Sequence, residues 1–133
     1  MKTKKKMTKE ELRGVLEAHK AWLADSTKGA KAYLSGADLH DADLRDANLR
    51  GANLHGADLR RADLSDADLR HADLSDAVMS GADLRGADLR YADLSCTILD
   101  GADLRMADLR MADLRIVYAD KVNIKRIEAE YAR

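Results

Sequence analysis

Small and apolar residues recur with a period of five along most of this chain. From Ala32 onward each unit begins with a small residue and carries an apolar residue, nearly always leucine, at its third position. Seventeen units follow without an insertion up to residue 116, and the pattern continues more weakly to residue 126. Five residues advance an α-helix by roughly 500°, so the leucines would form no single buried stripe. In an extended segment the first and third positions share one face. The pattern therefore predicts a chain that turns at every fifth residue and closes on itself.

The repeated unit A(D/N)LXX resembles the pentapeptide repeat family over about residues 32–126. This resemblance implies a mainly β fold, namely a right-handed quadrilateral parallel β-helix with the small residue and the leucine inside. It also implies four units for each coil, so that residues twenty apart stack. Neighbouring coils spaced about 4.8 Å apart would make a tower only ~20 to 25 Å tall. A coil cannot bury its apolar face alone, so we expect neighbouring coils to stabilise one another.

One outer column of the predicted coils loses its aspartates. The position just before leucine groups Asp38, Asp58, Val78, Ile98 and Tyr118 on one face. We call Val78, Ile98 and Tyr118 the apolar ridge. We expect the C-terminal segment or another subunit to cover this ridge. The alternative is a solvent-exposed ladder that stabilises stacking through side-chain contacts.

A second group of apolar residues lies at the predicted corners, two positions after leucine. Its members are Tyr91, Cys96, Met106, Met111 and Ile116, whereas earlier coils carry Gly, Asp or Arg there. These residues predict a contact surface near the C-terminal end. Cys96 alone predicts no reactive site, because a single surface cysteine most often has no special role.

The segment before the repeats has the pattern of an amphipathic helix over residues 9–24. Thr8 and Glu11 have the spacing of a capping box. One helical stripe then carries Leu12, Val15, Leu16, His19 and Leu23, flanked by Trp22. We expect residues 8–31 to form a capping helix and linker that cover the first coil, with Leu12, Leu16, His19, Trp22 and Leu23 packed there. His19 is interpreted as a packed or hydrogen-bonded residue of the cap, and not as a ligand or catalyst.

The C-terminal segment fits two patterns. Ile127 and Ala129 continue the five-residue frame, whereas Ile124, Ile127 and Tyr131 fit one helical face. We predict a short helix from about 123 to 132, with residues 127–133 forming a tail beyond the β-helix of residues 32–126. In several members of the family that this chain resembles, a C-terminal segment joins two towers. The resemblance therefore implies a homodimer through the C-terminal coil.

Composition limits the remaining functions. The chain has no Phe, no Pro, one Trp and one Cys, so Ala and Leu must fill the core and an internal disulfide is excluded. Residues 1–31 carry nine Lys/Arg against four Asp/Glu, whereas residues 32–126 carry thirteen against eighteen. We expect residues 1–7 to be a basic, disordered tail. The sequence shows neither a signal peptide nor a membrane span, and we expect a cytoplasmic protein.

The polar residues predict no catalytic, cofactor or metal site. The repeated aspartates occupy nearly equivalent positions, so no pair is divided into an acid and a base. Histidine is a common metal ligand, but His40, His55 and His71 fall on different predicted faces and cannot meet at one metal. A core filled by Ala and Leu leaves no room for a small-molecule substrate. We expect no enzyme.

We therefore predict a non-catalytic protein-interaction or structural scaffold with an unknown protein partner. The alternative comes from the resemblance, because some pentapeptide repeat proteins bind DNA gyrase by imitating duplex DNA. The alternating arginines dilute the acidity that such imitation needs. Attachment to nucleic acid or membrane is not expected, although Lys2, Lys4, Lys5, Lys6 and Lys9 form a basic run.

Overall fold

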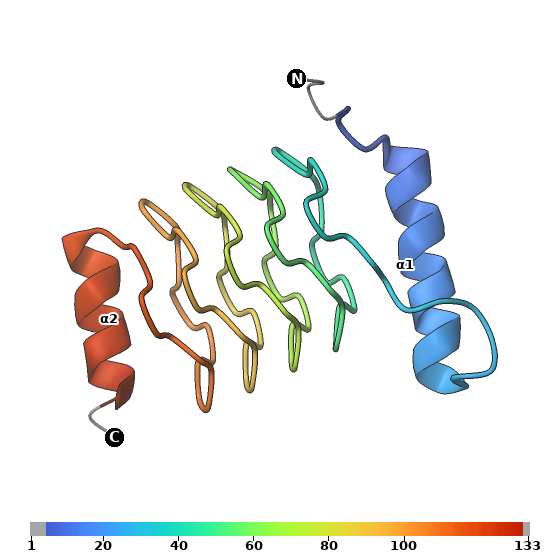
Figure 1. Ribbon diagram of the computed structural model, residues 1–133. Coiled ribbons are helices and arrows are strands. Elements are labelled where there is room, and N and C mark those ends of the chain that lie inside the picture. Colours follow the sequence, from blue (N-terminus) through green and yellow to red (C-terminus); the bar gives the residue numbers. More distant parts are fainter. Residues whose placement is uncertain (1–4, 132–133) are drawn as a thin grey trace.

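The protein is a stack of coils with one helix at each end (Figure 1). The computed structural model describes residues 5–131. Helix α1 spans Lys9–Ala24 and helix α2 spans Lys121–Tyr131. Between the helices, the second residue of each five-residue unit forms a parallel bridge with the residue twenty positions later. These bridges run from Tyr33 with Asn53 to Ile98 with Tyr118. One coil is therefore twenty residues long, as the resemblance implied.

Each coil has four sides. In the first coil the pairing positions are Tyr33, Asp38, Asp43 and Asn48. A corner follows each of them, so within residues 5–131 the pairings are isolated bridges and no continuous strand forms. Two backbone hydrogen bonds hold each interior bridge. Asp88, for example, donates its N–H to Ala67 O at 2.9 Å and accepts from Leu69 N–H at 2.8 Å.

The corners are tight turns with left-handed backbone. At a representative corner, Ala87 N–H donates to Leu84 O at 3.0 Å, which closes a four-residue turn. Its third residue, Gly86, has a φ of 69°, and every corner residue from Gly36 to Ile116 likewise has positive φ. A turn of this kind requires positive φ at its third residue, which Gly, Asn and Asp tolerate best. The backbone thus explains why Gly and Asp recur at this place in the repeat.

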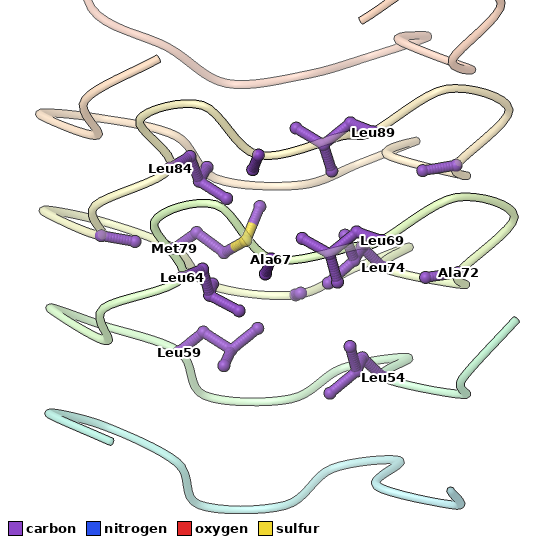
Figure 2. Close-up of a cluster of buried hydrophobic side chains, with 14 of the residues drawn as sticks. Leu54, Leu59, Leu64, Ala67, Leu69, Ala72, Leu74, Met79, Leu84 and Leu89 are labelled. Carbon is purple, nitrogen blue, oxygen red and sulfur yellow. The ribbon is translucent and has the colours of Figure 1, made fainter. Parts of the chain in front are cut away.

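The interior is a column of small and branched side chains (Figure 2). Ala and Leu point inward from all sides, and Met79 takes the place of one leucine. The leucines are almost fully buried, as are the alanines except Ala37, Ala42 and Ala47 of the first coil, which are partly buried. Each buried leucine contributes roughly 1.5 to 3 kcal/mol relative to exposure. Thr97 takes the place of one alanine, and its buried hydroxyl donates to Leu74 O at 2.9 Å. The core therefore accepts one polar group because that group is hydrogen-bonded.

Helix α1 lies across the N-terminal end of the stack (Figure 1). It begins at the predicted capping box, since Glu11 N–H donates to Thr8 Oγ1 and Thr8 N–H donates to Glu11 Oε1. The two residues before Thr8 differ from the expectation that residues 1–7 form a disordered tail. Lys6 forms a parallel bridge with Asp38, and Met7 N–H donates to Asp38 O at 3.1 Å. The open edge of the first coil gives this segment a pairing partner. Residues 1–4 lie outside the described residues.

Helix α2 covers the C-terminal end and begins earlier than predicted. The coils end with the bridge at Tyr118, and the helix begins at Lys121, so the β-helix does not reach residue 126. Asp120 explains the boundary, because its carboxylate accepts from Asn123 N–H at 2.9 Å and from Gly101 N–H at 2.7 Å. An aspartate that caps the first turn ends the repeat. Of the predicted helical face Ile127 is buried, while residues 132–133 and the side chains of Ile124 and Tyr131 lie outside the description.

Neither helix within residues 5–131 has the length and apolar composition that crossing a lipid bilayer would demand.

Candidate interaction surfaces

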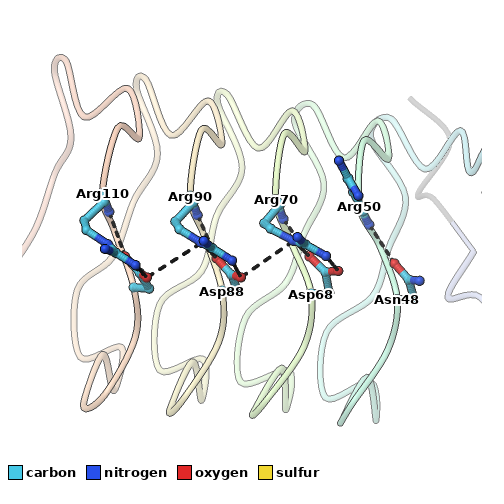
Figure 3. A network of polar contacts seen from close by, with 8 residues as sticks. Asn48, Arg50, Asp68, Arg70, Asp88, Arg90 and Arg110 are labelled. Atoms are coloured by element: carbon cyan, nitrogen blue, oxygen red, sulfur yellow. Dashed lines mark hydrogen bonds and ion pairs between the residues drawn. The ribbon is translucent and has the colours of Figure 1, made fainter.

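The sides of the stack carry ladders of aspartate and arginine. Figure 3 shows the ladder that contains Asp68, Arg70, Asp88 and Arg90. Arg70 donates through Nε and Nη2 to the two carboxylate oxygens of Asp68 at 2.9 and 2.7 Å. Its Nε also lies 3.6 Å from Asp88 Oδ2 in the next coil. Arg70 and Arg90 thus each bind the aspartate of their own coil and approach the aspartate of the next.

This pairing keeps the carboxylates ionised and their charge balanced. Hydrogen bonds from Arg105 and Arg110 lower the pKa values of Asp103 and Asp108 to about 2, and this effect exceeds that of burial, which raises them. Where serine replaces arginine, the hydroxyl takes over part of the role, as Ser65 Oγ donates to Asp63 Oδ1 at 2.7 Å. The sides therefore present paired charges in a repeating pattern, which is a poor basis for acid and base catalysis.

The predicted apolar ridge exists as a stacked column. Val78 pairs with Ile98 and Ile98 pairs with Tyr118 in parallel bridges. Val78 and Ile98 are half-buried, whereas Tyr118 at the last coil is exposed. The apolar ridge is thus most open to solvent at its C-terminal end.

Apolar corner residues surround the same end of the molecule. In the last coil, residues 99–118, the side chains of Met106, Met111 and Ile116 are 87%, 72% and 68% exposed. Val122 in the first turn of α2 is exposed as well. We define the C-terminal rim as the exposed apolar residues of this end: Met106, Met111, Ile116, Tyr118 and Val122. These residues come from three corners, one side and helix α2, so they belong to several sides of the same end of the stack.

The remaining predicted corner residues lie one coil earlier. Tyr91 is exposed, and its ring stacks on His71 with centroids 5.0 Å apart and planes 6° apart. Met111 occupies the same column one coil later. Cys96 is a half-buried free thiol at its corner. The structure thus brings Tyr91 and Met111 onto one edge of the tower, leading to the C-terminal rim.

At the other end, the predicted cap residues are buried to different degrees. Leu12 and His19 are buried, while Leu16, Trp22 and Leu23 are half-buried. His19 Nδ1 accepts from Ala32 N–H at 2.9 Å, so Nε2 carries the proton and donates to Arg50 O at 2.9 Å. The ring of His19 also stacks on Trp22, with centroids 5.7 Å apart. Burial lowers the pKa of His19, and the bond to Arg50 partly opposes this effect.

Helix α2 attaches to the last coil through polar side chains. Asn123 donates through Nδ2 to Leu99 O and to Ala102 O, both at 2.9 Å, and Arg126 donates to Ala107 O. A groove of about 390 Å³ remains beside these contacts, lined by Ala102, Leu104, Val122, Asn123 and Arg126 among others. This groove adjoins the C-terminal rim through Val122.

One cluster was missed from the sequence. Ligand atoms of Asp38, His40 and Asp58 all lie within 4.8 Å of one another. His40 and His55 lie on different sides and His71 lies at a corner, so the cluster does not join the histidines to one another. The signal that would have found the cluster is Asp-X-His in one unit, together with an aspartate twenty residues after the first.

Comparison with protein families gives a match to pentapeptide repeats in eight copies, over residues 30–66, 62–101 and 82–115. Comparison with curated protein sequences gives no match. Among solved structures, HetL, a pentapeptide repeat protein involved in heterocyst differentiation regulation in the cyanobacterium Nostoc, is similar with 39% identity and a TM-score of 0.65. That similarity covers 70% of this chain and 42% of HetL.

Two further structures agree. A pentapeptide repeat protein of the Arabidopsis thaliana thylakoid lumen is 36% identical with a TM-score of 0.61, over 67% of this chain and 61% of its own. Rfr23 of the cyanobacterium Cyanothece is 35% identical with a TM-score of 0.53, over 68% of this chain and 58% of its own. This chain therefore spans less than two thirds of the length of all three relatives. The repeats, the coil geometry and these similarities identify a right-handed β-helix solenoid, and the chain belongs to the pentapeptide repeat family.

Proposed function

We propose that the protein is a non-catalytic scaffold that binds another protein through its C-terminal rim. The observation that carries this proposal is the exposure of large apolar side chains at Met106, Met111 and Ile116. Exposed apolar groups that gather at one end of a protein are typical of contact surfaces. Methionine suits such a surface because its flexible side chain adapts to the shape of a partner.

The backbone at these corners strengthens the proposal. Met106, Met111 and Ile116 have φ values of 63°, 62° and 55°. Left-handed backbone costs an ordinary L-residue roughly 1 to 2 kcal/mol, and a β-branched residue there is a clear outlier. Asp41 and Asp46 occupy the same kind of corner in the first coil. The last coil therefore carries residues that are unfavourable for the backbone and unfavourable in water, and a bound partner would remove the second cost.

The charged sides of the tower are less suited to binding a protein than its apolar C-terminal end. On the side of Asp68, Asp88 and Asp108, each aspartate is bound by an arginine of its own coil, so this side offers a partner few unsatisfied charges. A second copy of the chain is the partner to test first, because an apolar rim around one end can face its own image across a two-fold axis. The scaffold proposal itself requires a protein partner and does not depend on that partner being identical.

The experiment compares the wild type with the triple variant Met106→Asn/Met111→Asn/Ile116→Asn. Asparagine tolerates left-handed backbone, so the variant keeps the fold while the rim becomes polar. Arg61→Asn/His71→Asn is the matched control, since both residues have positive φ at corners of earlier coils and neither belongs to the rim. Sedimentation velocity measures self-association, and pull-down from the native cell measures binding of other proteins.

We expect wild type and control to self-associate or to retain the same protein, and the triple variant to lose that association. A wild type that stays monomeric and retains no protein would overturn the proposal. So would a triple variant that associates as the wild type does.

A further inference from the structure

The first two coils interrupt one of the charge ladders. In the ladder shown in Figure 3, Arg70 follows Asp68 by two residues and lies between Asp68 and Asp88 of the next coil. On the side that begins with Asp38, the residue in the arginine position of the first coil is His40, and Asp58 is the aspartate of the next coil. Two aspartates therefore stack with a histidine in place of the permanent cation.

The side chains converge at this place. His40 Nδ1 lies 2.5 Å from Asp38 Oδ1, and His40 Nε2 lies 3.9 Å from Asp41 Oδ2. One nitrogen or oxygen from each of Asp38, His40 and Asp58 falls within 4.8 Å of the other two. All three residues are half-buried, so the cluster is open to a small ion from solvent.

We propose that Asp38, His40 and Asp58 bind a divalent transition-metal ion of the zinc class. The ion would supply the positive charge that Arg70 supplies between Asp68 and Asp88 on another side. One imidazole nitrogen with two carboxylate oxygens is a donor set that zinc accepts, and water completes its coordination. Calcium and magnesium prefer oxygen ligands alone, so the histidine selects against them.

The geometry allows the ion with small movements. Ligand atoms about 2.1 Å from a tetrahedral ion lie about 3.4 Å apart, so no separation in the cluster has to close by more than roughly 1.4 Å. The hydrogen-bonded pair of His40 Nδ1 and Asp38 Oδ1, at 2.5 Å, has to open by roughly 0.9 Å if both atoms bind the ion. Rotation of the half-buried side chains would allow movements of this size. Asp58 also accepts two hydrogen bonds from the Arg60 guanidinium, at 2.8 and 2.7 Å. A carboxylate has about four lone-pair positions, so Arg60 can remain as an orienting partner while Asp58 binds the ion.

Isothermal titration with zinc chloride tests this site in the full chain, free of any polyhistidine tag and treated with chelator beforehand. Cys96→Ser serves as the background for every variant, because a free thiol also binds zinc. His40→Arg removes the ligand and restores the Asp-Leu-Arg unit found at Asp58 and Arg60, so it keeps a sequence that this fold already uses. His55→Arg is the matched control, since His55 occupies the same position of a unit on another side.

We expect the background protein and His55→Arg to bind one zinc per chain with the same affinity. His40→Arg should lose affinity by about tenfold or more, because even residues that only orient a ligand change metal affinity by about 10- to 100-fold. Circular dichroism confirms that each variant is folded. The NMR signals of the His40 ring should move on zinc addition, and those of His55 should not. Absence of saturable binding in the background protein, or equal binding by His40→Arg, overturns the proposal.

Discussion

His19 in α1 donates through Nε2 to the carbonyl oxygen of Arg50 in the first coil, across 2.9 Å. The other ring nitrogen accepts from Ala32 N–H, so the ring joins the helix to the coil at two points. This arrangement requires a neutral ring, because a proton on Nδ1 would face the N–H of Ala32. Protonation of His19 would therefore weaken the contact that holds α1 to the first coil.

The first prediction concerns pH. The pKa of His19 is lowered in the folded protein, chiefly by burial. In the unfolded chain His19 has an ordinary pKa of about 6.5. As the pH falls below that value, the unfolded chain therefore binds more protons than the folded protein does, and protonation favours unfolding. The contribution of His19 to the free energy of unfolding is fully present above about pH 6.5 and is lost as the pH falls toward and through the lower pKa of the folded protein. Urea unfolding from pH 8 to pH 5 measures this loss.

His19→Gln is the control for that prediction. We expect it to lower the free energy of unfolding at pH 8 by about 1 to 3 kcal/mol, since one buried backbone partner loses its hydrogen bond. The difference between wild type and variant should shrink as the pH falls. A constant difference across this range would show that His19 titration does not affect the cap.

A second prediction concerns the linker behind α1. Gly29 has a φ of 62°, and a Cβ there would collide with Ala18 O and lie 2.8 Å from Ala21 Cβ. Gly51 has a φ of 71° with nothing within 4 Å of its Cβ position. Both alanine variants strain the backbone, but only Gly29→Ala also collides with the helix. Thermal unfolding should show Gly29→Ala to be less stable than Gly51→Ala by about 1 to 3 kcal/mol, and equal losses would contradict the close packing.

A third prediction concerns the contribution of an exposed residue of the C-terminal rim to stability. Ile116→Asn should raise the free energy of unfolding by about 0.5 to 1 kcal/mol, because it relieves a β-branched side chain at positive φ and removes an exposed apolar group. Leu114→Ala, two residues away in the core, should lower it by about 2 to 5 kcal/mol. Urea unfolding of both variants measures the contrast. Destabilisation by Ile116→Asn would mean that the isoleucine supports the fold.

The coils were predictable because the sequence states their geometry repeatedly. A period of five with Ala and Leu at fixed places excludes a helix, and the family resemblance supplies four sides per coil. The bridge between Val78 and Ile98 follows from that arithmetic. Helix α1 was equally clear, because Thr8 and Glu11 specify its start.

The ends of the stack were harder to predict because each depends on a single local contact. Asp120 ends the coils by capping α2, yet an aspartate is also the commonest residue of the repeat. Lys6 pairs with Asp38 only because the first coil has an open edge. The cluster around His40 needs two neighbouring coils, so no single unit reveals it.

A fourth prediction concerns imitation of DNA. Duplex DNA presents unpaired negative charge along its whole length. Here Asp68, Asp88 and Asp108 are each bound by an arginine of the same coil. We therefore expect DNA gyrase to supercoil plasmid normally in the presence of the protein. Inhibition of supercoiling, or protection of gyrase from an inhibitor, would restore the mimic hypothesis.

The most direct test of the scaffold is site-specific photocrosslinking at Met111 in the native cell, with His71 as the matched position. Both residues lie in one column at corners with positive φ, 62° and 60°, and only Met111 belongs to the C-terminal rim. The account predicts a covalent adduct of discrete mass with a protein from position 111 and none from position 71. Adducts of equal yield from both positions, or from neither, would contradict it.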